Sequence, residues 1–194
     1  NEKKFTPTTI NRKLSAIRTY YNWQVKEGFL DYNPAKNVKG LKEPMKTIPV
    51  LSDEDIQKLK QNLEKINDEL LKQVIFFLMN TGVRKGELFS ISKENYFEDG
   101  EKAYLKVWGK GNKERIIPLN ETAKSAFRFL FIEENIKKIT PISLWRKLKS
   151  LNKNLYPHIF RHTFATYLLR HGYDIGVVRD LLGHSSIATT NRYI

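Results

Sequence analysis

The sequence predicts a mainly α fold with a small antiparallel β-sheet, because its hydrophobic periodicity changes twice along the chain. Through most of the 194 residues, apolar side chains recur every three or four positions, which is typical of amphipathic helices. At residues 104–108 the pattern changes, and Leu105 and Val107 alternate with Tyr104, Lys106 and Trp108, which is typical of a strand. Apolar residues make up 40% of the chain and charged residues 28%, so we expect a folded globular protein.

The first predicted helix begins near Thr8 or Thr9, either of which can cap it, and ends at Gly28. Asn33-Pro34 predicts a second, short helical stretch. Two helices with one apolar stripe each cannot enclose a hydrophobic core. We therefore expect residues 1–44 to be the end of a small helical domain whose beginning lies outside this sequence.

A linker is expected at residues 45–49 and a second domain at residues 50–194. Ser52 can cap the first helix of this domain. Residues 70–79 are apolar on nearly all sides, which predicts a central helix that Thr81-Gly82 ends. Further helices are predicted at residues 84–89, 123–130 and 141–151, from Pro157, from Asp174 to Gly183, and after Ser185 or Ser186.

A small antiparallel sheet is predicted in the middle of this second domain. Asp99-Gly100 is a hairpin signal, and the alternation of Leu105 and Val107 with their neighbours at residues 104–108 predicts a strand. A second tight turn at residues 109–112 leads into a further strand at residues 115–119. This arrangement places Lys110 at the tip of a loop.

The charge balance indicates a nucleic-acid partner. The chain has 34 Lys and Arg against 21 Asp and Glu, a net charge of +13, which is typical of nucleic-acid binders; the alternative is that the charge serves solubility alone. Residues 135–173 contain no acid, which favours a phosphate backbone close to this block. Its basic residues are Lys137, Lys138, Arg146, Lys147, Lys149, Lys153, Arg161 and Arg170.

Several classes of protein are excluded by composition. The absence of cysteine rules out disulfides, thiolate metal sites and cysteine catalysis, and it fits a reducing cytoplasm. The longest apolar run, residues 74–79, is too short to span a membrane, and the first residues do not read as a signal peptide. We therefore expect no membrane partner.

The helix that begins at Pro157 carries two histidines, which could bind phosphate and move a proton or could bind a metal ion. His158 and Arg161 are three residues apart on one face, where they can bind a phosphate oxygen and move a proton, unless they are two unrelated surface residues. His158 and His162 are four apart, but zinc needs a third ligand and Arg161 would oppose a dication. We therefore expect no metal, and we interpret His162 as a packed or capping residue. The Gly-Lys turn at 109–113 lacks the spacing of a nucleotide-binding loop.

Five short motifs follow one another along the chain. They are TGVRKGEL at 81–88, GKGNKER at 109–115, HIFRHTFAT at 158–166, LLGHS at 181–185 and a tyrosine at 193. In this order and spacing they closely resemble the tyrosine recombinase family, also called phage integrases, and within it the compact Xer-type members. The resemblance implies that residues 50–194 form the catalytic domain and residues 1–44 the end of the DNA-gripping core-binding domain.

The resemblance also implies an active site, which needs no metal or other cofactor. It would consist of Arg84, Lys110, His158, Arg161, His184 and Tyr193. Tyr193 would attack the scissile phosphate and hold the strand as a 3′-phosphotyrosyl ester. Arg84 and Arg161 would clamp the non-bridging oxygens, because planar guanidinium groups suit phosphate.

The remaining active-site residues would move protons or bind the phosphate. Lys110 would be the general acid for the leaving 5′ oxygen. His158 and His184 would hydrogen-bond the phosphate, and His158 is the expected participant in proton transfer from the tyrosine. Glu87 lies in the first motif, where we expect a structural ion pair.

The partner implied by the resemblance is a double-stranded DNA recombination site. It would be bound by a homo-tetramer, or together with a related recombinase, in the prokaryotic cytoplasm or nucleoid. Candidate DNA-binding residues are Arg12, Lys13, Arg18, Arg146, Lys147, Lys149 and Lys153.

The sequence differs from the family pattern in two places. The stretch between Lys110 and His158 is shorter than we expect of the family. The chain also ends one residue after Tyr193, where relatives usually continue into a helix that docks onto a neighbouring protomer. We therefore expect this chain to be a piece of a longer protein.

Three other functions remain open at this point. A type IB topoisomerase would share the covalent chemistry but relax DNA without exchanging partners. A DNA-binding module with an inert site is the second alternative. A metal-dependent nuclease is the third, although the sequence lacks the clustered carboxylates that would hold Mg²⁺.

Overall fold

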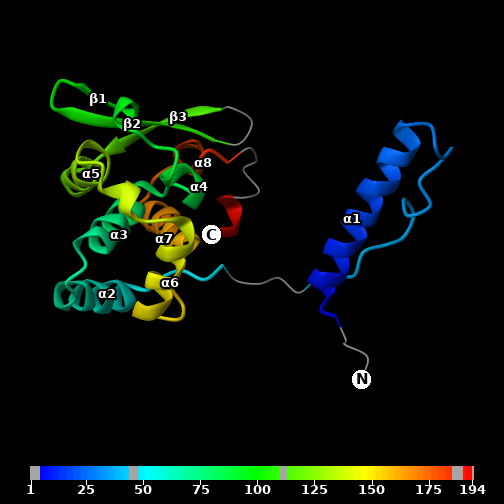
Figure 1. The fold of residues 1–194 in the computed structure, drawn as a ribbon, viewed down its shortest axis with the longest axis horizontal. Coiled ribbons are helices and arrows are strands. Elements are labelled where there is room, and N and C mark those ends of the chain that lie inside the picture. The colour runs from blue at the N-terminus through cyan, green and yellow to red at the C-terminus, as the bar shows by residue number, and fades with distance from the viewer. Residues whose placement is uncertain (1–4, 44–47, 110–112, 185–189, 194) are drawn as a thin grey trace. The chain divides into compact units, whose positions relative to one another are not determined.

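The computed structural model describes residues 5–43, 48–109, 113–184 and 190–193. The chain divides into two compact units, residues 1–47 and 48–194, which are described separately (Figure 1).

The first unit contains one long helix, α1 (Pro7–Lys26). Its N-cap is Thr6, whose side-chain oxygen accepts a hydrogen bond from the backbone N–H of Thr9 at 3.3 Å. The prediction of a cap at Thr8 or Thr9 was wrong, because Pro7 suits the first turn of a helix, where its missing N–H costs nothing. Gly28 follows the helix with a φ of +77°, a conformation that glycine adopts without strain.

The helix predicted at Asn33-Pro34 is a series of turns instead. The Asn33 side chain accepts a hydrogen bond from the Ala35 N–H at 2.8 Å and donates to the Arg18 carbonyl at 3.1 Å. Asparagine side chains that bond their own backbone in this way compete with helix formation. The Arg18 guanidinium donates to the carbonyls of Ala35 and Val38, so it holds this segment against α1.

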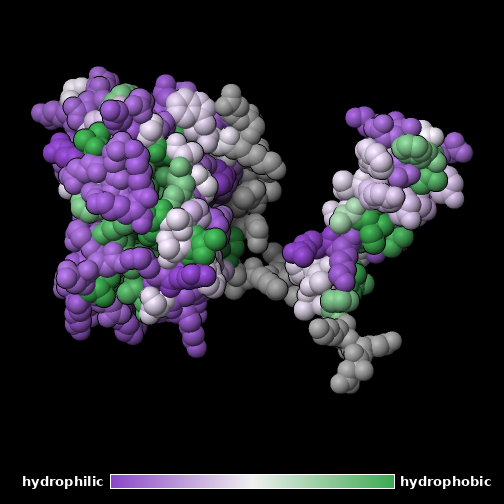
Figure 2. Space-filling view, viewed as in Figure 1, coloured by the Kyte–Doolittle hydropathy of each residue, from purple (hydrophilic) through white to green (hydrophobic). Residues whose placement is uncertain are grey.

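Apolar side chains of the first unit remain largely exposed. Helix α1 has no buried residue, and Ile17 and Trp23 are 47% and 48% exposed. Hydrophobic residues accordingly show on the surface of this unit in Figure 2. The described segments of this unit therefore leave much of their apolar surface accessible.

The second unit is mainly helical, as predicted. Its helices are α2 (Asp53–Lys65), α3 (Glu69–Thr81), α4 (Lys85–Leu88), α5 (Glu121–Phe127), α6 (Pro141–Leu151), α7 (Pro157–Arg170) and α8 (Ile175–Leu182). Short helical turns lie at Lys93–Asn95, Arg128–Ile132, Asn135–Lys138 and Asn191–Tyr193, the last labelled η4. The predicted caps Ser185 and Ser186 lie outside the described residues.

Helix α3 is the centre of this unit, as its apolar sequence predicted. It packs against α5 and α7 and contacts the sheet (Figure 1). Val74, Ile75 and Phe77 are fully buried. Gly82 ends the helix with a φ of +60°, and a Cβ added there would lie 2.5 Å from Phe164 Cδ1. Only glycine fits this close approach to α7.

The sheet has three antiparallel strands in the order β1 (Tyr96–Asp99), β2 (Lys102–Trp108) and β3 (Glu114–Leu119). Leu105 of β2 pairs with Tyr96 on one side and Ile117 on the other. The sheet lies at one end of the helical body, and α2 and α6 lie at the other (Figure 1). The predicted fold class is confirmed. Within the described part of the chain, no helix is both long enough and apolar enough to cross a membrane.

Candidate active site

The end of helix α8 holds three arginine side chains through consecutive backbone carbonyls. The pairs are Arg115 Nε with Leu181 O at 2.9 Å, Arg161 Nη2 with Leu182 O, and Arg84 Nη2 with Gly183 O at 3.1 Å. The last carbonyls of a helix lack intrahelical partners and carry partial negative charge. They therefore suit guanidinium groups and bring together side chains from the N-cap of α4, from β3 and from α7.

Among the described residues of the predicted site, Arg161 is the most deeply buried, with 3% of its surface exposed. Its Nη1 also donates to the Gly82 carbonyl at 2.7 Å, so the guanidinium spans the ends of α3 and α8. Burial, together with the charge of Arg84, lowers the pKa of Arg161 to about 9. The group therefore stays charged at neutral pH.

Glu87 joins two of the arginines. Its carboxylate accepts two hydrogen bonds from Arg115, at 2.9 and 2.7 Å, and one from Arg84 Nη1 at 2.7 Å. The Arg84 backbone N–H donates to it as well, at 2.6 Å. Burial raises the pKa of Glu87, but the hydrogen bonds and charge of Arg115, with those of Arg84, outweigh it and lower the pKa to about 2. The structural ion pair expected at Glu87 is present.

At Gly109 the base of the β2–β3 hairpin lies close to Arg84 and Arg115. Its N–H donates to the Lys113 carbonyl at 2.8 Å, and a Cβ added to it would lie 3.8 Å from Arg84 Nη1 and 3.6 Å from Arg115 Nη1. Lys110, the next residue and the predicted general acid, lies outside the described residues.

His184 follows α8 directly and is half-buried. Its Nδ1 lies 2.9 Å from the hydroxyl of Thr190, which is fully buried. Burial, followed by the charge of Arg161, lowers the pKa of His184 to about 4. The imidazole is therefore neutral at pH 7 and offers one donor and one acceptor.

His158 lies in the first turn of α7 and is exposed to solvent. Partial burial and the charges of Arg161 and Arg84 lower its pKa. Its ring centre is 6.3 Å from that of His162, four residues further along the helix.

Tyr193 lies in η4, which packs against α7. Its hydroxyl is 2.8 Å from Nδ1 of His162, and its ring stacks beside His184 with the ring centres 6.2 Å apart. It also interacts electrostatically with Arg161. The structure thus brings together five of the six predicted active-site residues, Arg84, His158, Arg161, His184 and Tyr193. His162, interpreted from the sequence as packed or capping, contacts the tyrosine hydroxyl.

The predicted DNA-binding residues of the first unit have different surroundings. Arg12 and Lys13 are exposed on α1, and the Lys13 ammonium lies 3.4 Å from the centre of the Phe5 ring. Arg18 is half-buried and bonds the carbonyls described above.

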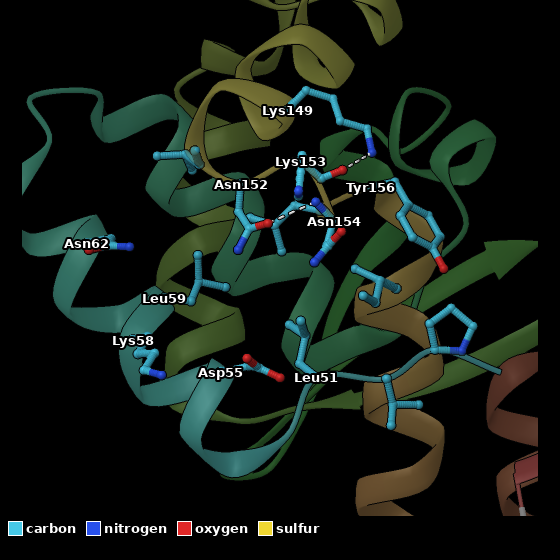
Figure 3. Close-up of a pocket in the computed structure, with 15 residues that line it drawn as sticks. Leu51, Asp55, Lys58, Leu59, Asn62, Lys149, Asn152, Lys153, Asn154 and Tyr156 are labelled. Carbon is cyan, nitrogen blue, oxygen red and sulfur yellow. Dashed lines mark hydrogen bonds between the residues drawn. The ribbon is translucent and has the colours of Figure 1, made fainter. Parts of the chain in front are cut away.

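The predicted DNA-binding residues of the second unit lie on α6 and just after it. Arg146 and Lys153 are exposed, whereas the Lys147 ammonium forms an ion pair with Asp68. The Lys149 ammonium donates to the Lys153 carbonyl (Figure 3).

A cavity of about 470 Å³ opens beside these lysines, between α2 and the start of α7 (Figure 3). Leu51, Leu59 and Ile159 contribute apolar side chains to its lining, and Asn62 and Asn154 contribute polar ones. It lies next to the basic segment after α6.

Arg115 and His162 are site residues whose contacts the sequence did not predict. Arg115 is in phase with Ile117 and Leu119, which face the core, so a charged residue at an inward position of the strand was a usable signal. For His162 no such signal exists, because its partner is 31 residues away along the chain. Among the described residues, no group of three or more potential ligands could hold a metal ion.

Comparison with known proteins identifies the family. The model of the phage integrase family matches residues 49–194. The tyrosine recombinase XerD of Oceanobacillus iheyensis is 30% identical over 212 residues, which cover 95% of this chain and 70% of that protein. The tyrosine recombinase XerC of Thermodesulfovibrio yellowstonii is 30% identical over 214 residues, covering 96% of this chain and 70% of that protein.

Solved structures share the fold. The XerH site-specific recombinase, bound to a palindromic difH substrate, superposes with a TM-score of 0.75 at 21% identity, over 98% of this chain and 62% of that one. The Tn1549 transposon integrase gives a TM-score of 0.71 at 18% identity, over 99% of this chain and 76% of that one. These likenesses concern the fold alone. The family match and the two XerD and XerC relatives show that the chain belongs to the tyrosine recombinases of the phage integrase family.

Proposed function

We propose that this protein is a site-specific DNA recombinase that cleaves and rejoins duplex DNA through a 3′-phosphotyrosyl intermediate and exchanges strands between paired sites. The observation that carries the proposal is the position of Tyr193, whose hydroxyl and ring lie against His162 and His184 beside the Arg161 guanidinium. A nucleophile next to fixed cations is the arrangement that phosphoryl transfer requires.

Arg84 and Arg161 clamp the two non-bridging oxygens of the scissile phosphate. Both guanidinium groups keep N–H donors for the phosphate after bonding the carbonyls at the end of α8, because each terminal guanidinium nitrogen carries two N–H groups. Those bonds hold both planar groups in place before DNA arrives. A preorganised clamp can stabilise the extra charge of the pentavalent phosphorus without moving at the moment of reaction.

The histidines and the hairpin lysine complete the site. His158 and His184 hydrogen-bond the phosphate as neutral imidazoles, a state that the lowered pKa of each favours. Lys110 protonates the leaving 5′ oxygen. Its neighbour Gly109 lies beside the arginine cluster, which supports this role.

Duplex DNA is the proposed partner. The net charge of +13 and the acid-free segment from residue 135 to residue 173 favour binding of its phosphates. The exposed side chains of Arg12, Lys13, Arg146 and Lys153 are available for these contacts, with Arg18, Lys147 and Lys149 nearby along the chain. We propose assembly as a tetramer on paired sites, which the resemblance to the tyrosine recombinases implies. The XerH recombinase, which shares the fold, was solved bound to its difH substrate.

Covalent capture tests this function. Duplexes of randomised sequence that carry a nick trap a covalent intermediate when cleavage occurs close to the nick, because the short cleaved fragment then diffuses away. In EDTA, we expect an adduct that survives denaturing electrophoresis with the wild-type chain and not with Tyr193→Phe. Tyr173→Phe, which removes an exposed hydroxyl elsewhere, is the matched control and keeps the adduct. DNA binding without an adduct would instead favour an inert binding module.

Strand exchange separates recombination from topoisomerase activity. Two differently labelled duplexes carrying the captured sequence are mixed with the protein. A recombinase yields molecules that carry both labels. Relaxation of a supercoiled plasmid with no doubly labelled product would favour the type IB topoisomerase alternative.

A further inference from the structure

We propose that His162 receives the proton of the Tyr193 hydroxyl during strand cleavage, an inference that rests on the function proposed above. Nδ1 of His162 lies 2.8 Å from Oη of Tyr193, within the distance that a general base requires. The sequence assigned this transfer to His158, four residues earlier on the same helix. The geometry places the base one helical turn further on.

Both partners of this contact are held by packing that involves α7. The ring of Tyr193 packs against the small apolar cluster formed by Ala165, Leu168, Val178 and Leu182. His162 directly follows Arg161, whose bonds to the ends of α3 and α8 fix this part of the helix. The tyrosine oxygen is therefore directed at His162 before DNA binds.

Three other side chains at the site are already used or unsuitable as the base. Arg84 and Arg161 carry only donors and cannot take a proton. Nδ1 of His184 is bonded to Thr190. His162 is half-buried, with its Nδ1 on the phenol oxygen.

The step balances in protons and bonds. As Oη of Tyr193 attacks phosphorus, the Oη–H bond breaks and its proton passes to Nδ1 of His162. The bond from Oη to phosphorus forms, the bond from phosphorus to the 5′ oxygen breaks, and that oxygen takes the proton proposed to come from Lys110. In rejoining, the 5′ hydroxyl attacks phosphorus and passes its proton to the neutral amine proposed for Lys110. The bond from phosphorus to Oη breaks, and the imidazolium of His162 returns its proton to the phenol oxygen.

The test measures the rate of adduct formation on the nicked duplex recovered by covalent capture, with the full chain. We expect His162→Ala to slow the reaction on the order of 10²-fold, the size of a general-base contribution. His162→Asn keeps an acceptor atom near the Nδ1 position but cannot take a proton, so it should remain slow. His171→Ala, at the exposed end of the same helix, is the matched control and should react at the wild-type rate.

Changing the acidity of each reacting oxygen separates a proton acceptor from a packing residue. Incorporation of 3-fluorotyrosine at position 193 makes the phenol more acidic, and it should recover about tenfold of the His162→Ala loss because a weaker base then suffices. It should not rescue Lys110→Ala. A 5′-phosphorothiolate leaving group, which departs without a proton, should rescue Lys110→Ala and leave the His162 defect in place.

The outcomes also separate this inference from the proposed function. If His162→Ala reacts like His171→Ala, if His162→Asn restores the wild-type rate, or if fluorination rescues His158→Ala instead, then His162 is not the base. Adducts would still depend on Tyr193 in each of those cases. If the wild-type chain forms no adduct, or Tyr193→Phe forms one, the proposed function itself is wrong. Thermal unfolding and DNA binding of each variant show that it is folded.

Discussion

Arg115 and Glu87 form a buried ion pair in which two parallel hydrogen bonds, of 2.9 and 2.7 Å, join a strand of the sheet to helix α4. Their side chains are only 6% and 7% exposed. The same carboxylate orients Arg84, which lies closer to the phosphate in the proposed function. The pair therefore ties the sheet to the arginines that we propose clamp the phosphate.

Glu87→Gln should destabilise the protein by about 3 kcal/mol or more, because it leaves the Arg115 charge buried without its partner. Chemical denaturation of the variant and the wild type measures the difference. Glu54→Gln is the control, since it breaks the Lys58 ion pair, in which both side chains are largely exposed. Equal stability of both variants would contradict a structural role for the buried pair.

The same carboxylate should govern stability in acid. The pKa of Glu87 is about 2 in the folded protein against an ordinary value of 4.5. A group whose pKa falls on folding stabilises the protein at pH values above its pKa in the unfolded chain. This contribution is lost as the pH falls from about 4.5 towards 2. Urea titrations across this range should show a steeper loss in the wild type than in Glu87→Gln.

His184 should change the stability of the protein at higher pH than Glu87 does. Its pKa is about 4 in the folded protein against 6.5 ordinarily, so the unfolded chain binds more protons between these values. Stability should therefore decline as the pH falls from 6.5 to 4, and the decline should be smaller in His184→Gln. Thermal unfolding at a series of pH values makes the comparison. Parallel curves for the two proteins would show that the imidazole is not buried against the arginines.

Gly82→Ala should lower the free energy of unfolding, whereas Gly86→Ala should raise it. At Gly82 the φ of +60° disfavours a side chain, and the added Cβ would lie 2.5 Å from Phe164. We expect a loss of about 1–2 kcal/mol from the backbone alone, and weaker cleavage because the Gly82 carbonyl holds Arg161. Gly86 lies in α4 with no atom within 4 Å of a Cβ, so alanine there should stabilise by up to about 1 kcal/mol. Differential scanning calorimetry distinguishes the two.

Arg161→Lys should reduce adduct formation on the order of 10²-fold or more, because a lysine cannot hold two carbonyls and a phosphate oxygen together. Affinity for duplex DNA should change far less, since it depends on many phosphate contacts. Rates from covalent capture and affinities from fluorescence anisotropy give the two quantities. A proportional loss of both would indicate a general binding role for the residue.

The exposed basic side chains on and just after α6 should contribute to the salt dependence of DNA binding. Arg146→Gln and Lys153→Gln should each lower the slope of log affinity against log salt by about 1, if each side chain neutralises one phosphate. Anisotropy at several KCl concentrations measures the slope. Lys65→Gln, at the end of α2, removes the same charge from an exposed position and should leave the slope unchanged.

Local sequence patterns were sufficient for most elements of the second unit. Ser52 forms the predicted cap with Asp55, and Gly82 and Gly183 end their helices with positive φ. These features depend on residues a few positions apart, so the sequence carries them directly. The errors at Thr6 and Asn33 arose where two local signals compete, proline against a cap and a side-chain turn against a helix.

The sequence by itself determined the helices, the hairpin sheet, the basic character and, through motifs resembling a known family, the residue types of the site. Only the tertiary structure decided which groups meet. Arg115 reaches Leu181 over 66 residues of chain, and His162 reaches Tyr193 over 31. Periodicity specifies which face of an element is buried. The partner on that face is chosen by how the helices and the sheet pack, and no spacing along the chain encodes it.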